Sequence, residues 1–126
     1  MTLSIRNVVD AGLIDSERLV LRMDPGGDLG DYAVLLTYTD ESGALKTGVK
    51  AAFWFPYKEV AAGSLVVIYT KAGEEKIRER KDGGHTYFYY WGETEPLWDD
   101  KATTAILLNA PNWTKYQNLG EEDAEE

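Results

Sequence analysis

Cysteine is absent from the 126 residues, and histidine occurs only once, at position 85. Without cysteine the chain can form no disulfide, no thiolate nucleophile and no cysteine-ligated zinc or iron–sulfur site. His85 follows Gly84 in a turn, and no serine lies in a nucleophile-elbow motif. We therefore expect His85 to be an exposed turn residue rather than a general base.

Long apolar runs are also absent, so no segment reaches the length of a membrane span. Residues 1–6 lack the basic-then-apolar pattern of a secretory signal. Hydrophobic residues nevertheless make up 44% of the chain, which is enough to bury a core in one domain. We therefore expect a soluble cytoplasmic protein that has no membrane partner.

Basic residues are few relative to acidic ones: 13 Lys and Arg stand against 22 Asp and Glu, a net charge of −9. Five of the acids lie in the last six residues; without them, 17 acids against 13 bases leave −4. Nucleic-acid binding depends on a basic surface, so we expect no nucleic-acid partner. Residues 120–126 have too few apolar side chains to fold, which predicts one domain over 1–119 and a disordered acidic tail over 120–126.

Apolar residues alternate with a period of two, which is typical of β-strands. Turn signals rich in Gly, Asp and Ser separate short apolar segments, for example at 40–43 and 81–84. This pattern favours an all-β sandwich or barrel over a fold that alternates strands with helices. The segments expected to form strands are Glu17–Met23, Asp31–Thr39, Lys50–Phe55, Ser64–Lys71, His85–Trp91 and Thr103–Asn109.

Three other segments are less regular. Tyr57–Ala62, followed by Gly63, has the pattern of a single helical turn. Glu74–Lys81 is mostly charged and contains most of the basic residues that cluster between Lys71 and Lys81. Because acids interrupt this basic cluster, we interpret the segment as an exposed strand or loop protected by its charges rather than as a phosphate-binding patch. The leading residues 1–16 are compatible with one extra strand.

Three segments, in this order along the chain, resemble the lamin-tail domain family. Residues 21–36 (LRMDPGGDLGDYAVLL) are similar to the family's Pro-x-Gly-x-Asp-x-Gly-x-Glu stretch and the strand after it. The corresponding residues, in the same order, are Pro25, Gly27, Asp28, Gly30 and Asp31, with Asp31 where the family usually has Glu. Residues 53–70 resemble its Phe-Pro, Leu-x-Pro-Gly and Val-x-Val run, with Ala62 in place of the second Pro. Residues 89–108 resemble the Tyr-Trp-Gly, Trp-Asn-Asn and Asp-Thr-Ala-x-Leu pattern of bacterial members.

The resemblance covers roughly residues 19–115 and implies a fold, the immunoglobulin-like β-sandwich. It also implies a binding or tethering role, because family members are tail domains of nuclear filament proteins or accompany other domains in bacterial proteins. The family brings no catalytic centre that could be assigned to residues of this chain.

Aromatic residues are frequent, with eight Tyr, four Trp and three Phe. In residues 87–91, strand alternation places Tyr87, Tyr89 and Trp91 on one face and Phe88 on the other. Phe88 has no polar group, so we predict that its face is buried. The opposite face, together with Trp98 from the next loop, is then predicted to bind a ligand or partner. For the cluster as a whole we favour the simpler interpretation, in which the core and the loop from Trp91 to Trp98 cover both faces.

Three aspartates, Asp24, Asp28 and Asp31, lie in a glycine-rich loop and are weak candidates for a Ca²⁺ site. Their spacing differs from that of an EF-hand loop, and no bidentate Glu follows them. We expect instead that the glycines adopt positive φ angles and that the aspartates cap backbone N–H groups. We therefore expect no metal and no cofactor.

The leading functional hypothesis is a non-enzymatic interaction module that binds a protein partner through aromatic loops or an exposed strand edge. The alternative is a carbohydrate- or small-ligand-binding domain that uses exposed aromatic residues. A third hypothesis is a hydrolase with paired acids, Glu93 with Glu95 or Asp99 with Asp100, but adjacent acids on one loop need not face each other across a cleft. The aromatic-rich edge is also compatible with a homodimer.

Overall fold

The chain folds into short β-strands, as the period-two pattern predicts. A computed structural model describes residues 2–46 and 48–120. Within these residues the one helical element is a 3-10 turn, η1 (Leu29–Asp31). The strands are β1 (Leu3–Val9), β2 (Arg18–Met23), β3 (Gly27–Asp28), β4 (Tyr32–Tyr38), β5 (Ala51–Trp54), β6 (Glu59–Val60), β7 (Ser64–Tyr69), β8 (Lys76–Glu79), β9 (His85–Tyr90) and β10 (Thr103–Asn109).

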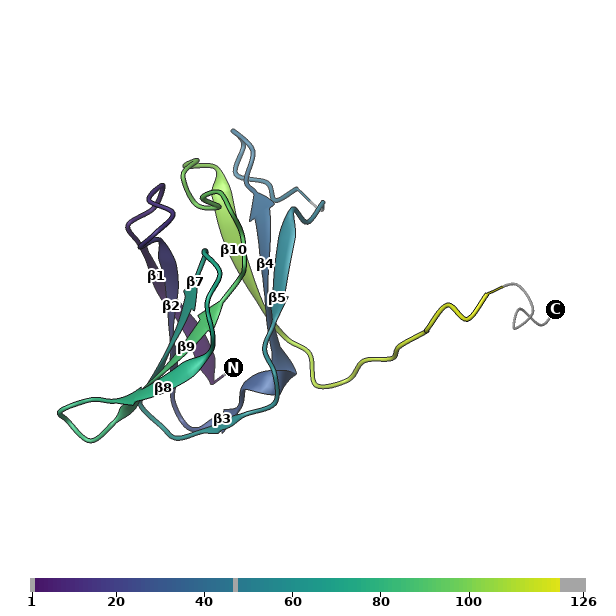
Figure 1. Cartoon of the computed structure of the whole chain (residues 1–126). Helices are drawn as coiled ribbons and strands as arrows, with labels where there is room; N and C mark the ends of the chain where they lie inside the picture. Colours follow the sequence, from purple (N-terminus) through teal and green to yellow (C-terminus); the bar gives the residue numbers. More distant parts are fainter. Residues whose placement is uncertain (1, 47, 121–126) are drawn as a thin grey trace.

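Two sheets contain most of these strands (Figure 1). The larger sheet has the order β1-β2-β7-β9-β8, and the smaller has the order β10-β4-β5. Neighbouring strands are antiparallel except β7 and β9, which run parallel at the centre of the larger sheet. A short pairing of β3 with β6 lies at the lower end of the molecule in Figure 1.

The core lies between the two large sheets, so the fold is an all-β sandwich. Strand alternation directs Leu19, Leu21 and Met23 of β2 inward, where they have no exposed surface. Val34 and Leu36 of β4 are fully buried in the same cluster, from the opposite sheet. Complete burial of such a side chain contributes about 1.5–3 kcal/mol, so these alternating positions hold the sheets together.

All six predicted strands are present, and their ends lie within two residues of the prediction. The expectation of an exposed charged strand is confirmed by β8, and the leading residues supply β1. The predicted helical turn at Tyr57–Ala62 is wrong, because Glu59 and Val60 form β6 and pair with β3. Val60 is only 4% exposed, and its burial against the core fixes the segment in an extended form.

The C-terminal segment 110–120 follows β10 without forming a strand, and all of its residues are exposed. Figure 1 shows it leading away from the two sheets. Near its start the ring of Trp113 packs edge-to-face against Trp54, with centroids 5.0 Å apart. The predicted disordered tail lies outside the described residues, except for Gly120. In the described part of the chain no helix is long and apolar enough to cross a membrane.

Candidate functional site

The predicted aromatic site lies on the inner face of β9. Tyr89 is only 5% exposed and belongs to the core, where its ring packs edge-to-face against Phe55 at 5.4 Å between centroids. Tyr87 and Trp91 are half-buried and pack against the same core. Phe88 is 6% exposed, so its predicted burial is confirmed, but the core cluster contains Tyr89 and not Phe88. The prediction that the Tyr89 face is open is therefore wrong. Because β9 is aromatic on both sides, the missing polar group of Phe88 does not decide its orientation.

Trp98 joins this group from the loop after β9. Its ring lies 6.2 Å from that of Trp91 in an edge-to-face arrangement, and the residue is 6% exposed. The structure brings the four predicted residues together, but as a cluster inside the sandwich and not as an open platform. Burial raises the pKa of Tyr89 to about 12, because the phenolate would lose its hydration.

A buried carboxylate, which no sequence motif marks, holds the Trp98 loop in place. Glu17 has no exposed surface. Its Oε1 accepts hydrogen bonds from the backbone N–H groups of Gly12 (2.9 Å) and Trp98 (3.1 Å). Its Oε2 accepts one from the backbone N–H of Leu97 (2.9 Å) and one from the Thr70 hydroxyl. All four donors are neutral protein groups, so the arrangement is that of a structural anchor.

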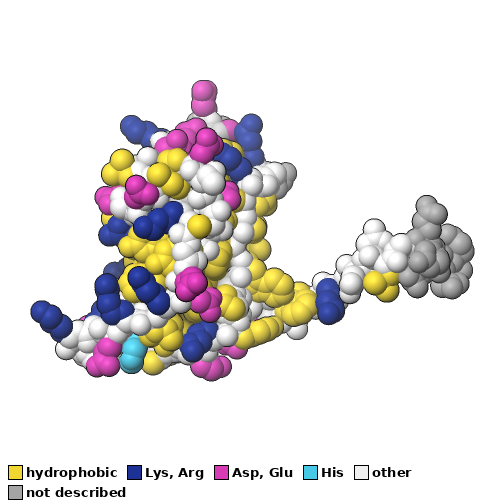
Figure 2. Space-filling view, viewed as in Figure 1, with side chains coloured by type: hydrophobic (Ala, Val, Ile, Leu, Met, Phe, Trp, Pro, Cys, Tyr) yellow, Lys and Arg dark blue, Asp and Glu magenta, His cyan; other side chains and the backbone are white. Residues whose placement is uncertain are grey.

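The outer face of β9 lies beneath a layer of cations. On this face Tyr90 stacks against Tyr69 of β7, with centroids 5.4 Å apart. Arg78 and Lys76 of β8 lie 5.0 and 5.5 Å from the centre of the Phe88 ring. Figure 2 shows Lys and Arg side chains over this side of the molecule. Such cation–π contacts are worth about 0.5–1 kcal/mol at exposed sites, so these basic residues help to cover the aromatic sheet face.

The aspartates of the glycine-rich loop do not converge on one point. Asp28 Oδ1 accepts hydrogen bonds from the backbone N–H groups of Gly30 and Lys58, both at 2.9 Å, which confirms the predicted capping role for this residue. Asp24 instead forms an ion pair with Arg22 at 3.9 Å. Among the residues that the structure describes, no group of three His, Cys, Asp or Glu is placed to hold a metal ion.

The predicted positive φ angles in this loop are wrong, because Gly26, Gly27 and Gly30 all lie outside that region. Two of them are required by close contacts instead. A Cβ atom at Gly30 would lie 2.2 Å from the Tyr57 ring, and one at Gly26 would lie 2.6 Å from a backbone carbonyl oxygen.

At the end of the loop, the Asp31 carbonyl accepts a hydrogen bond from the N–H of Ala110 at 2.7 Å, which ties the start of the C-terminal segment to the sheet.

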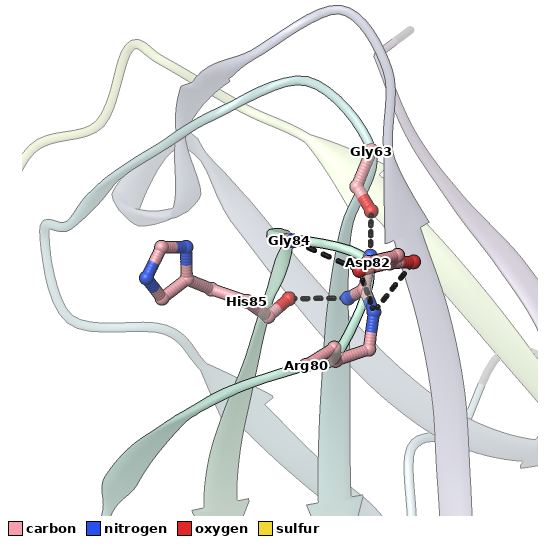
Figure 3. A network of polar contacts seen from close by, with 5 residues as sticks. All are labelled: Gly63, Arg80, Asp82, Gly84 and His85. Carbon is pink, nitrogen blue, oxygen red and sulfur yellow. Dashed lines mark hydrogen bonds and ion pairs between the residues drawn. The ribbon is translucent and has the colours of Figure 1, made fainter.

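A polar network surrounds the turn before β9 (Figure 3). The Arg80 guanidinium donates to the carbonyl oxygens of Gly63 (3.1 Å) and His85 (2.6 Å) and pairs with Asp82 at 3.3 Å. The N–H of Gly84 donates to the Asp82 carboxylate at 2.8 Å, and this bond and Arg80 lower the pKa of Asp82. The His85 ring points away from the network. His85 is half-buried and begins β9, so the expectation of an exposed turn residue is wrong. The network fixes one turn against another.

The outer face of the three-stranded sheet is apolar. The strand register sets two rows of side chains across it, namely Leu108, Ala33 and Trp54 in one and Ile106, Leu35 and Ala52 in the other. Leu108 is 40% exposed and Trp54 is 52% exposed. Figure 2 shows hydrophobic side chains on this side, down to where the C-terminal segment leaves the body. Exposed apolar patches of this kind often mark interaction sites.

One edge of the three-stranded sheet is the free side of β10. The N–H of Ala110 donates to the Asp31 carbonyl, and the N–H of Thr39 donates to the Ala102 carbonyl. These two bonds show which residues of β10 form hydrogen bonds with β4. Even-numbered residues of β10 therefore bond to β4, and the backbone groups of odd-numbered residues point away from it. In the described chain, three N–H groups at this edge have no partner: those of Ala105, Leu107 and Asn109.

The other outer strands of the two sheets are protected against pairing with a further strand. All four residues of β8 are exposed and three are charged, while β1 has a register shift between Ile5 and Asn7. β5 has four residues and ends just before Phe55-Pro56. In contrast, β10 has seven residues with no charge and a continuous register. Natural sheets block exposed edges with charges, bulges, prolines or short strands, and β10 has none of these.

These features define an all-β sandwich with one unprotected, uncharged sheet edge beside an apolar sheet face. Profiles of known protein families give no match to the chain, and a search of curated proteins finds no similar sequence. We therefore infer function from the surfaces of this chain.

Proposed function

We propose that the protein is a non-enzymatic interaction module that binds an extended segment of a protein partner along the free edge of β10. The observation that carries the proposal is the row of three unpartnered N–H groups on an uncharged, regular strand. A partner strand would extend the β10-β4-β5 sheet through main-chain hydrogen bonds. The proposal includes an immunoglobulin-like sandwich of the lamin-tail type, which the ordered sequence resemblance supports.

The chemistry next to the edge indicates what kind of strand would bind. Ile106 and Leu108 lie on the outer face of β10 and continue the apolar rows of that sheet. Each new backbone hydrogen bond would contribute only about 0.5–1.5 kcal/mol, so side-chain contacts must supply selectivity. A partner strand with apolar side chains at alternate positions would cover Ile106 and Leu108, and charged residues there would not.

The proposal is tested by selecting peptides from a displayed random library against the immobilised protein. The diagnostic variant is Ala105→Pro, because the Ala105 N–H points away from β4 and its loss leaves the ladder intact. We expect selected peptides to have alternating apolar residues and to lose at least about tenfold in affinity for this variant, or about 1.4 kcal/mol. Ala52→Lys, on the same face at the far edge, is the matched control and should bind normally. Peptides that bind Ala105→Pro as well as the wild type would contradict the proposal.

A second candidate function, carbohydrate or small-ligand binding, is favoured by a different observation. Trp54, Tyr57 and Trp113 are all exposed, and the two tryptophans line an apolar hollow of about 230 Å³. Exposed aromatic rings are suited to stacking on a flat ligand. A glycan array tests this function: hits should disappear in Trp54→Ala and persist in Ala105→Pro. An array without hits would remove this candidate.

A further inference from the structure

We propose that the strand which pairs with the β10 edge is β10 of a second copy of this chain, so that the protein forms a symmetric homodimer. The inference rests on the proposed function, because it uses the same edge. It is carried by the self-complementarity of the edge in its hydrogen bonding, its side chains and its charge.

Hydrogen bonding fixes the register of such a pair. A two-fold axis beside Ile106 makes the strands antiparallel and sets residue 105 opposite 107 and residue 103 opposite 109, so that every pair lies inside β10. The free N–H groups of Ala105, Leu107 and Asn109 then meet the carbonyls of Leu107, Ala105 and Thr103 in the other copy. The Thr103 N–H needs no partner, because it already donates to the Asp100 carbonyl at 3.0 Å. All free donors of both edges are satisfied.

Side chains match in the same register. Even-numbered positions fall in the closely spaced pairs of the new ladder, with Cα atoms about 4.5 Å apart. Ile106 then meets its own copy across the axis, and Thr104 meets Leu108. Pairs of β-branched and apolar residues stabilise neighbouring strands. The apolar rows of the two sheets would also become continuous across the dimer.

Charge does not oppose the pairing, although the chain carries a net charge of −9. The charged residues nearest to β10 in sequence are Asp99, Asp100 and Lys101 at its beginning. In the same antiparallel register these residues fall opposite residues 111–113 of the other copy, which carry no charge. Pro111 has no N–H, so the row of donors ends at Asn109, within the paired length.

Sedimentation velocity over a concentration series, from the order of 1 μM to 1 mM, tests the dimer. We expect the mass of the full chain to rise from 14.1 kDa toward twice that value. Ala105→Pro removes an edge donor, and Ile106→Lys places two cations against each other at the axis; each should weaken dimerisation at least about tenfold. Ala52→Lys adds the same charge at the far edge of the sheet and should dimerise as the wild type does.

Hydrogen exchange of the wild type supplies a second readout that needs no variant. The amides of Ala105, Leu107 and Asn109 should exchange rapidly in dilute protein and become protected as concentration rises. This measurement decides the matter if either β10 variant fails to fold by circular dichroism.

The outcomes separate this inference from the proposed function. A wild type that stays monomeric, while selected peptides still bind in a manner sensitive to Ala105→Pro, would overturn self-pairing and leave the interaction module intact. A dimer that persists in both β10 variants, or that leaves the three amides unprotected, uses another surface and overturns the inference. A monomer whose selected peptides ignore Ala105→Pro would overturn both.

Discussion

Replacing Glu17 tests whether one buried carboxylate anchors the loop that carries Trp98. In Glu17→Gln an amide nitrogen takes the place of one oxygen. The least costly orientation of the Gln side chain places the amide nitrogen at the position of Oε2. There the Thr70 hydroxyl can rotate to accept a hydrogen bond from the amide, but the Leu97 N–H loses its acceptor. A buried donor left unsatisfied costs about 1–3 kcal/mol. In Glu17→Ala three backbone N–H groups lose their acceptor, so the loss should be at least about 3 kcal/mol.

Urea unfolding followed by tryptophan fluorescence measures these losses. The free energy of unfolding falls by about 1–3 kcal/mol per molar urea. A loss of about 2 kcal/mol in this free energy therefore lowers the midpoint of the urea transition by roughly 1 M. Asp15→Asn removes an exposed acid from the same loop and should change the free energy of unfolding by less than about 0.5 kcal/mol. If Glu17→Gln unfolds at the same urea concentration as the wild type, the four hydrogen bonds do not stabilise the fold and the reasoning fails.

Three further predictions follow from the core and the tail. Tyr89→Ala should lose about 3–5 kcal/mol in the same urea assay, because Tyr89 is in the core; wild-type stability would place this side chain elsewhere. The pKa of Tyr89 is raised from 10.0 to about 12, so its neutral side chain stabilises the folded state fully below pH 10, and this stabilisation is lost as pH rises toward 12. Tyr89→Phe should therefore flatten the decrease in the free energy of unfolding between pH 10 and about 12. A variant with the same pH dependence as the wild type would count against burial of Tyr89. Truncation after Leu119 removes mainly acidic residues and should shift the melting temperature by less than about 4 °C in calorimetry; a larger loss would mean that the tail contacts the folded body.

The strands could be predicted from the sequence because each depends on local alternation. Leu19, Leu21 and Met23 identify the buried face of β2 without any knowledge of its neighbours. The same rule failed for β9, where Tyr89 and Phe88 are both large, aromatic and buried. Only the packing of Tyr89 against Phe55, a residue far away in the sequence, distinguishes the inner face from the outer one.

The candidate sites depend on contacts between distant segments, so the sequence could not reveal them. Glu17 receives hydrogen bonds from Leu97 and Trp98, which are 80 and 81 residues away. The free N–H groups of β10 follow from its pairing with β4, at a sequence separation of at least 65 residues. The general hypothesis of a binding strand edge came from composition and resemblance, and it stays a proposal that the peptide selection tests.

The pairing of β4 with β10 also has a consequence for how the chain folds. β4 is the middle strand of its sheet, yet its partner β10 lies at least 65 residues further along the chain. Pairing between such distant segments forms slowly, so one side of β4 has no partner until β10 docks. The small sheet is therefore completed late in folding, and the partly folded chain is most exposed to wrong pairing at β4.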